Sequence, residues 1–412
     1  MATLYRRQPK LRTLRLDSIH LDPVIASLSQ VRRANVATLY LCTSDPDEAS
    51  SWNRVLPTLP NLRNLELAAS RDLNDGPYPL NVDASSDVLT KLLDWKSQES
   101  QYKLHLHTLQ VQGFDLTDAA EALRRNIHFP GLQVLGMQLC KNPARLLEVL
   151  YETRELESQN LRTLIIVEAE KSPASRAYSP ALSRVLGTFS TLEHLIVRTK
   201  GNSAYWSDFE AIAGHAASLR LLHLDRPTPR PLPQGVKRGS SSIMQLRKLE
   251  QITLPMSSIV PAEADCCATA CCYKDMHYVL LVLDALPSLR TFQILGMRLG
   301  DLNVQQIDRQ VLRAYALRQM RTLADYVFNA LANLKVLSLE RYVYHNPDTG
   351  RRESYNGQYY HRGKTIDAVG REQATAIEAS LRELKQIEPA VDILGMEDLE
   401  HGSLFRYGYD LP

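Results

Sequence analysis

The clearest feature of the chain is a repeated spacing of large apolar residues, Leu-x-x-Leu-x-Leu, in which other large apolar residues replace some leucines. Within each copy the last two apolar positions alternate with a polar one, as in a short half-buried β-strand. The copies are Leu11/Leu14/Leu16, Val36/Leu39/Leu41, Leu62/Leu65/Leu67, Leu106/Leu109/Val111, Leu132/Leu135/Met137, Leu161/Leu164/Ile166, Leu192/Leu195/Val197, Leu219/Leu222/Leu224, Leu249/Ile252/Leu254, Leu289/Phe292/Ile294 and Leu334/Leu337/Leu339. Val391/Leu394/Met396 is a candidate degenerate last copy.

The segments between copies carry helical spacing. Most copies begin about 25–31 residues apart, close to the ~20–29 residues of one strand-plus-helix unit. Apolar residues recur with the period of a helix at Val24, Ile25, Leu28 and Val31, and at Ala119, Ala120, Leu123 and Ile127. Asn142 and Pro143 predict a helix start through an N-cap and a first-turn proline, and Ser207 with Glu210 predicts a capping box.

Two stretches interrupt this rhythm, residues 226–248 and residues 341–364, and two further helices are predicted beside them. Residues 226–248 are rich in proline, glycine and serine and predict an inserted loop. Residues 301–331 predict one long helix whose buried stripe includes Leu323 and Val327. Residues 341–364 are rich in Tyr and Gly and predict a loop, and a polar helix is predicted from about Ile366 to Gln386.

The repeated copies resemble leucine-rich repeats, especially the long, irregular ones of fungal-type F-box-associated and ribonuclease-inhibitor-like proteins, from about Leu11 to Leu339. The third residue after the last strand leucine is often Asn or Cys in that family, and Cys140 matches this position. The corresponding positions that depart from it are Ile19, Ser44, Ser70, Phe114, Ala169, Lys200, Pro227 and Ser257.

This resemblance implies an α/β fold, an irregular solenoid or horseshoe with parallel strands on the concave face and helices on the convex face. We expect residues 1–340 to form the solenoid, with about eleven irregular repeats. Residues 341–412, the Tyr-rich loop and the C-terminal helix, are expected to form a cap.

Composition narrows the class of protein. The formal charge of +2 lies near neutrality, so no nucleic-acid partner is implied. The longest apolar run, Tyr278 to Leu283, is far too short to span a bilayer, and the Arg-rich start lacks the apolar stretch of a signal peptide. Six cysteines, four of them crowded between Cys266 and Cys272, do not form a disulfide framework. We therefore expect a cytoplasmic or nuclear protein without a membrane segment.

Motifs for nucleotide and metal chemistry are weak. Gly363-Lys364-Thr365 resembles the end of a phosphate-binding loop, but Gln358 stands where the loop needs a glycine. Cys266, Cys267, Cys271 and Cys272 with His277 offer zinc ligands at unusual spacing, and small buried cysteines are the simpler interpretation. His105 with His107, and His194 with His223, are interpreted as contact residues rather than ligands. We expect no catalytic residue, no cofactor and no metal.

A partner surface follows from the alternation of side chains along a strand. If the apolar residues of each copy point to the core, the residues between them project to the opposite, concave face. This rule selects Thr13, Arg15, Asp17, Tyr40, Glu66, Gln110, His194, Arg198, His223 and Gln293. Tyr355 and Tyr359 follow the last clear copy, and either contact a partner or pack the chain end as a cap.

The sequence thus favours a non-catalytic protein-binding module. The resemblance implies one particular form, an F-box-like substrate-recognition subunit of a ubiquitin ligase. It would bind a Skp-type adaptor if a longer form carried an F-box, because no F-box precedes the first copy. A structural scaffold unrelated to ubiquitin is a second interpretation. A hydrolase with unrecognised site residues is a third.

Overall fold

The computed structural model of the 412-residue chain comprises two compact units, Met1–Trp206 and Ser207–Pro412. From the sequence we expect a boundary near residue 340, between the solenoid and the cap. The residues that the structure describes are 12–16, 35–43, 45–69, 86–93, 103–153, 160–168, 175–198, 209–225, 241–255, 274–295, 309–339, 342–345, 352–355 and 358–388.

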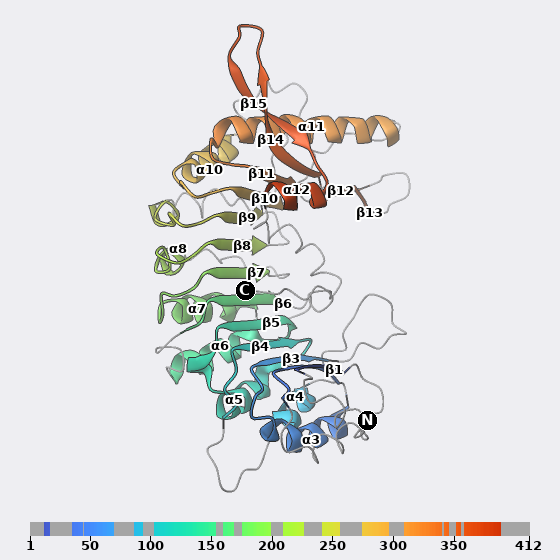
Figure 1. Ribbon diagram of the computed structural model, residues 1–412, viewed down its shortest axis with the longest axis vertical. Coiled ribbons are helices and arrows are strands. Elements are labelled where there is room, and N and C mark those ends of the chain that lie inside the picture. The colour runs from blue at the N-terminus through green and yellow to red at the C-terminus, as the bar shows by residue number, and fades with distance from the viewer. Residues whose placement is uncertain are drawn as a thin grey trace. The chain divides into compact units, whose positions relative to one another are not determined.

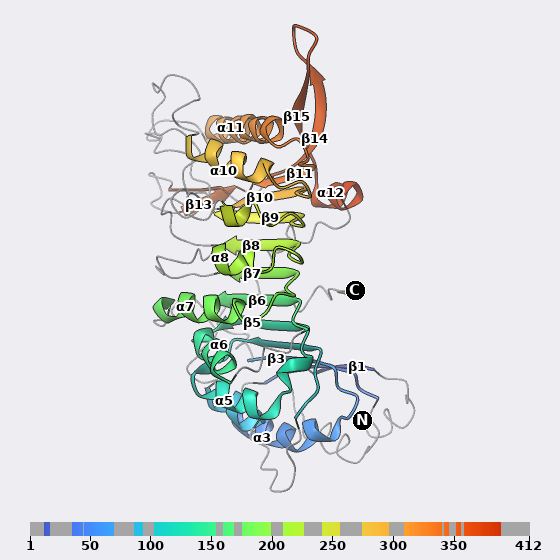
Figure 2. The same cartoon turned by 90° about the vertical axis from the view of Figure 1, so that its left-hand side faces the viewer.

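Parallel strands in sequence order build the first unit (Figure 1). The strands are β1 (Thr13–Leu16), β2 (Thr38–Cys42), β3 (Asn64–Ala68), β4 (Thr108–Gln112), β5 (Val134–Cys140), β6 (Thr163–Glu168) and β7 (His194–Arg198). The helices are α3 (Pro46–Val55), η1 (Leu56–Thr58), α4 (Ser86–Leu93), α5 (Leu116–Asn126), η3 (Phe129–Gly131), α6 (Pro143–Glu152) and α7 (Ser175–Leu186). Figure 2 shows α5, α6 and α7 on one side of these strands.

The repeated leucines lie in register across this sheet. Each copy in the sequence coincides with one strand, and every strand pairs in parallel with the next. The middle leucines form a ladder in which each side chain is fully buried: Leu39, Leu65, Leu109, Leu135, Leu164 and Leu195. The predicted strands and the predicted burial of Leu135 and Leu195 are therefore confirmed.

A backbone contact repeats at the start of each strand. The amides of Gln133 and Val134 both donate to the carbonyl oxygen of His107, at 2.8 and 3.0 Å. One strand later, the amides of Arg162 and Thr163 donate to Gln133 at 2.8 and 3.0 Å. Such shared carbonyls satisfy the amide of the residue that precedes each strand. They also fix the register of successive copies.

The last residue of β5, Cys140, faces inward. Cys140 is completely buried, and its Sγ lies 3.4 Å from the carbonyl oxygen of Val111. Burial raises the pKa of its thiol to about 12, although the backbone amides of Gly113 and Phe114 act in the opposite direction. Leu139 adopts a positive φ of 50° beside it. The thiol of Cys140 therefore contacts the backbone of the neighbouring strand β4.

The helices between strands follow the predictions wherever residues are described. Helix α5 buries Ala119, Ala120 and Leu123, and α6 begins with Pro143 in its first turn. Asn142 stands at the N-cap of α6 but makes no capping bond, because its backbone is left-handed and its amide instead donates to Thr117. The expected helix at 24–31 and the capping residue Ser207 lie outside the described residues.

The second unit continues the parallel pattern and then reverses it. Its parallel strands are β8 (Leu221–Asp225), β9 (Gln251–Pro255), β10 (Thr291–Leu295) and β11 (Val336–Leu339), followed by the antiparallel strands β14 (Gln358–Ile366) and β15 (Glu372–Glu378). A separate antiparallel pair joins β12 (Tyr342–His345) to β13 (Arg352–Tyr355). The helices are α8 (Phe209–Ala213), α10 (Lys274–Asp284), α11 (Arg309–Ala330) and α12 (Leu381–Ile387).

The predicted helix from Ile366 to Gln386 is wrong. Its first two thirds form the β14–β15 turn and strand β15, and only α12 is helical. Asp367 closes the turn by accepting hydrogen bonds from the amides of Val369 and Arg371, at 2.9 and 2.8 Å, and Gly370 supplies a φ of +80°. Local side-chain bonds of this kind compete with helix formation. The predicted loop at 341–364 likewise contains β12, β13 and most of β14.

Helix α11 holds the β14–β15 hairpin. Asn329 Nδ2 donates to the carbonyl oxygen of Ala374 at 2.9 Å, and Asn329 Oδ1 accepts from the Ala374 amide at 3.0 Å. Asp325 Oδ1 accepts from the Ala376 amide at 2.6 Å. Arg362 of β14 donates to the carbonyl oxygens of Phe328 and Leu331 near the end of α11. These bonds cover the outer edge of β15, so α11 and the hairpin together close this end of the sheet.

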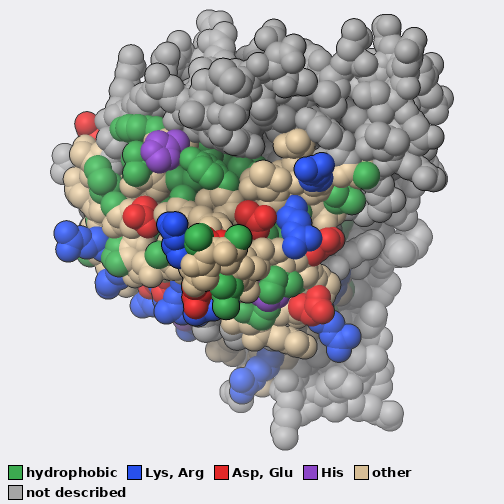
Figure 3. Space-filling view, turned by 90° about the horizontal axis from the view of Figure 1, so that it is seen from above, with side chains coloured by type: hydrophobic (Ala, Val, Ile, Leu, Met, Phe, Trp, Pro, Cys, Tyr) green, Lys and Arg blue, Asp and Glu red, His purple; other side chains and the backbone are tan. Residues whose placement is uncertain are grey.

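The hairpin end also carries exposed apolar side chains. Ile366 is 72% exposed and Val369 is 70% exposed. Figure 3 looks onto this end, where hydrophobic side chains lie among acidic and basic ones.

The predicted long helix at 301–331 is confirmed over Arg309–Ala330, with Leu323 and Val327 buried, while 301–308 lie outside the described residues.

Candidate binding surface

Four side chains of the first unit line up across neighbouring strands, and we call them the polar row: Arg15, Tyr40, Glu66 and Gln110. They are paired in register on β1, β2, β3 and β4. Because neighbouring residues of a strand face opposite sides, the row lies on the face opposite to the leucine ladder. Arg15 is exposed and the other three are half-buried. The row is therefore an accessible part of the predicted partner surface in this unit.

The row ends where the chemistry changes. The next register positions on β5, β6 and β7 are Gly136, Ile165 and Ile196. Ile165 and Ile196 are 6% and 5% exposed. The polar row thus passes into a buried apolar stretch of the same face.

Arg15 and Tyr40 form a stacked pair. The guanidinium carbon of Arg15 lies 4.6 Å from the centre of the Tyr40 ring. An arginine over a tyrosine ring is attracted by the negative face of the ring. The contact orients both side chains toward the same face.

Glu66 lies next to Tyr40 on the neighbouring strand, where burial disfavours the charged form of its carboxyl group. Burial raises the pKa of its carboxyl group above the ordinary value, and the nearby Arg15 opposes the rise. Within the described part of the chain no hydrogen bond reaches the carboxylate. Gln110 on the other side instead accepts a 3.3 Å hydrogen bond from Gln138.

Replacing Glu66 by Gln should therefore stabilise the fold at neutral pH. A carboxyl group with a raised pKa in the folded state supports stability below its ordinary value of 4.5 and loses that contribution as the pH rises through the folded pKa. Glu66→Gln removes this loss, so its melting temperature should exceed that of the wild type at pH 7 and match it near pH 4. Melting curves across pH test this, and a variant that is less stable at every pH would contradict it.

The remaining predicted contact residues differ in accessibility. His194 is half-buried, with Nδ1 3.4 Å from Thr163 Oγ1, and Arg198 is buried. In the second unit His223 and Gln293 are buried, and Gln293 accepts a 3.0 Å hydrogen bond from Thr253. Thr13 is exposed, and Asp17 lies outside the described residues.

Of the two predicted contact tyrosines near the chain end, Tyr355 and Tyr359, the structure describes the side chain of Tyr359 only. Tyr359 is half-buried and pairs in register with Ser338, whereas its neighbour Tyr360 is 2% exposed on the opposite face. Burial raises the pKa of Tyr360 above its ordinary range. Tyr360 is therefore a core residue of the second unit. Tyr355 belongs to β13, and its side chain lies outside the described residues.

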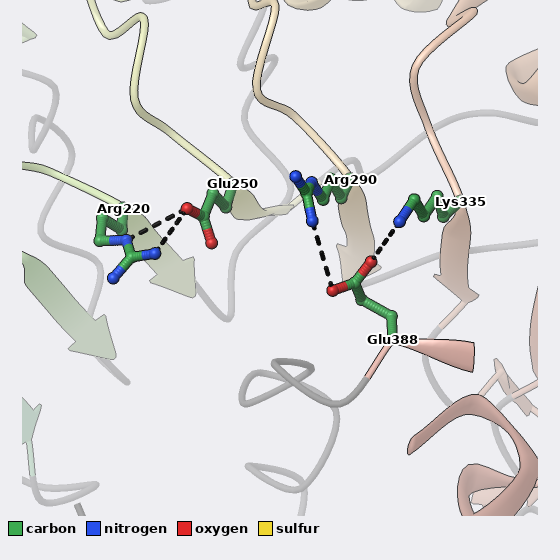
Figure 4. Close-up of polar contacts among 5 residues, drawn as sticks. All are labelled: Arg220, Glu250, Arg290, Lys335 and Glu388. Atoms are coloured by element: carbon green, nitrogen blue, oxygen red, sulfur yellow. Dashed lines mark hydrogen bonds and ion pairs between the residues drawn. The ribbon is translucent and has the colours of Figure 1, made fainter. Parts of the chain in front are cut away.

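Sequence reasoning missed a series of ion pairs at the strand starts of the second unit (Figure 4). Arg220 pairs with Glu250 at 2.8 Å. Farther along, Glu388 lies 2.9 Å from Lys335 and 3.8 Å from Arg290. The Glu388 side chain is only 8% exposed, so this carboxylate secures the end of α12 to β10 and β11. The signal was the charge of the second residue of each copy, which alternates in sign over Arg220, Glu250 and Arg290.

The weak motifs for chemistry resolve in part. Gly363-Lys364-Thr365 lies within β14, where these residues pair with β15 and Lys364 contacts Glu372 at 2.6 Å. Extended backbone of this kind does not form a phosphate loop. His277 Nδ1 lies 3.1 Å from the hydroxyl of Tyr326. Cys266, Cys267, Cys271 and Cys272 lie outside the described residues.

Two further histidines of the sequence analysis lie at the surface of the first unit. His105 and His107 are exposed, and the centre of the His105 ring lies 4.6 Å from that of the His128 ring, with the ring planes tilted by 43°. Within the described ranges, no three His, Cys, Asp or Glu side chains are grouped to hold a metal ion. Of the helices described, none combines the length and apolar character needed to cross a bilayer.

No protein-family model matches the chain, and no curated protein matches it.

Proposed function

We propose that this chain is a non-catalytic protein-binding module of the leucine-rich-repeat type, and that it contacts its partner through the polar row. The observation that carries the proposal is the register of Arg15, Tyr40, Glu66 and Gln110, which lie side by side on the face opposite to the leucine ladder. Support for the repeat type comes from the match between copies and strands, and from the buried Cys140.

A protein is the favoured partner because of the size and chemistry of the row. Four parallel strands spaced by about 4.8 Å span roughly 14 Å, the reach of several residues of a bound chain. An arginine stacked on a tyrosine combines the two residue types most typical of interface hot spots. Repeat proteins commonly bind partners on such extended faces.

The F-box-like interpretation and the scaffold interpretation both fit this module. We place the protein in the cytoplasm or nucleus in either case. Affinity purification separates them, because a ligase subunit recovers a Skp-type adaptor and a cullin. A scaffold recovers a stoichiometric complex without those proteins.

A paired charge reversal tests the surface itself. In Arg15→Glu/Glu66→Arg the net charge is kept, while the stacking on Tyr40 and the position of each charge are lost. We expect this variant to lose the proteins that the wild type recovers. The matched control reverses Glu121 and Arg124, a partly exposed ion pair of 2.9 Å on helix α5. If the row variant is folded and recovers every partner, the row is not the contact surface.

A further inference from the structure

The carboxylate of Glu66 differs from the other acidic groups of the first unit that have paired donors. Asp115 lies 3.2 Å from Lys141, and Glu193 lies 3.3 Å from Arg162. Glu66 is half-buried and receives no hydrogen bond within the described part of the chain. A desolvated charge without a donor costs stability, so a donor supplied by a bound partner would stabilise it.

Arg15 and Gln110, which flank Tyr40 and Glu66 in the polar row, each contact another residue. Arg15 stacks on the ring of Tyr40 at 4.6 Å rather than forming an ion pair with Glu66. On the other side Gln110 accepts a hydrogen bond from Gln138. Its stem lies over Gly136, since a Cβ at that glycine would come within 3.2 Å of Gln110 Cγ. The absence of a side chain on Gly136 lets Gln110 lean away from Glu66.

The charged residues described beside the row are arginines. Arg63 at the start of β3 donates to the carbonyl oxygen of His105 at 3.1 Å, and Arg15 is the charged group that acts on the Glu66 carboxyl. Arg12 and Arg63 are exposed beside the row. Their positive charges disfavour a run of basic residues but still allow a single basic side chain to reach Glu66.

We propose that Glu66 is the anchor for one lysine or arginine side chain of the protein partner, received between Tyr40 and Gln110. This inference rests on the proposed function, because it places the partner on the polar row. An ammonium or guanidinium group supplies the charged donor that the carboxylate lacks, and such charge-assisted bonds are among the stronger ones in proteins. The neighbouring Tyr40 ring adds a surface suited to a cation.

Small cations test the site without knowledge of the partner. The protein is labelled with ¹³C at glutamate carboxyl carbons, and the Glu66 signal is assigned from its loss in Glu66→Gln. Butylammonium, butylguanidinium and neutral butylurea are then titrated in turn. We expect one or both cations to shift the Glu66 signal saturably at millimolar concentration and to lower the pKa of Glu66. The two cations distinguish a lysine from an arginine as the natural ligand.

The controls decide every outcome. Glu193→Gln removes a carboxylate that is already paired with Arg162, so it should leave the Glu66 response unchanged. A response to butylurea as large as to the cations, or no saturable response of Glu66, overturns the cation site. If the cations bind but Arg15→Glu/Glu66→Arg retains all partners, the proposed function fails while the cation site stands. If that variant loses its partners and the carboxyl signal of Glu66 responds to neither cation, only the cation inference fails.

Discussion

Replacing Leu135 by Ala is expected to lower the free energy of unfolding by about 2–5 kcal/mol, the usual effect of deleting a large buried side chain. Leu135 is completely buried and lies in register between Leu109 and Leu164, which are also completely buried. A cavity at this point removes contacts to the strands on both sides. Leu195→Ala should have an effect of the same order, because Leu195 occupies the same position on β7 and is equally buried.

Urea unfolding followed by circular dichroism measures this change, with Leu281→Ala as the matched control. Leu281 lies on α10 and is 58% exposed, so the same substitution there should change stability by less than about 0.5 kcal/mol. Equal effects of Leu135→Ala and Leu281→Ala would show that the repeated leucines do not form a buried ladder.

The second large effect is expected at the closed end of the sheet, where Asp325→Ala should lower the free energy of unfolding by about 1–3 kcal/mol. Asp325 Oδ1 accepts hydrogen bonds from the Ala376 amide at 2.6 Å and from the Thr375 hydroxyl at 3.2 Å. Ala376 is 1% exposed, so its amide would be left buried without an acceptor. Hydrogen exchange at Ala376 should accelerate along with the loss of stability.

Asp284→Ala is the matched control for this prediction, since Asp284 is exposed at the end of α10. It should leave both stability and Ala376 exchange close to the wild type. If Asp325→Ala behaves like Asp284→Ala, α11 does not hold the edge of β15.

The parallel part of the fold could be predicted because each copy shows the two-residue period of a strand, and the residues between copies show the period of a helix. The alternation in Leu132/Leu135/Met137 specifies a strand with one buried face, and the helical spacing at Ala119 and Leu123 specifies α5. The hairpin near the end could not be predicted this way. Its residues have no strong apolar alternation, and its strands depend on Asp325 and Asn329, which lie about 50 residues earlier in the sequence.

The polar row could be predicted from the same alternation, because the sequence alone places Arg15, Tyr40 and Glu66 on one face of the strands. Accessibility could not be predicted, since it depends on tertiary packing, and Gln293 at an equivalent position of β10 is 1% exposed. The sequence also could not predict that the Glu66 carboxylate receives no hydrogen bond from the described residues. That depends on the directions taken by the side chains of Arg15 and Gln110.

The most direct test of the proposed binding surface is photo-crosslinking from two tyrosines on opposite faces. Benzoylphenylalanine is placed either at Tyr40, in the polar row, or at Tyr151, which is 37% exposed on helix α6. Each variant is irradiated with its recovered partners, and the linked proteins are identified by mass spectrometry. We expect a specific crosslink from position 40 and none from position 151. A partner that links from position 151 and not from position 40 would contradict it.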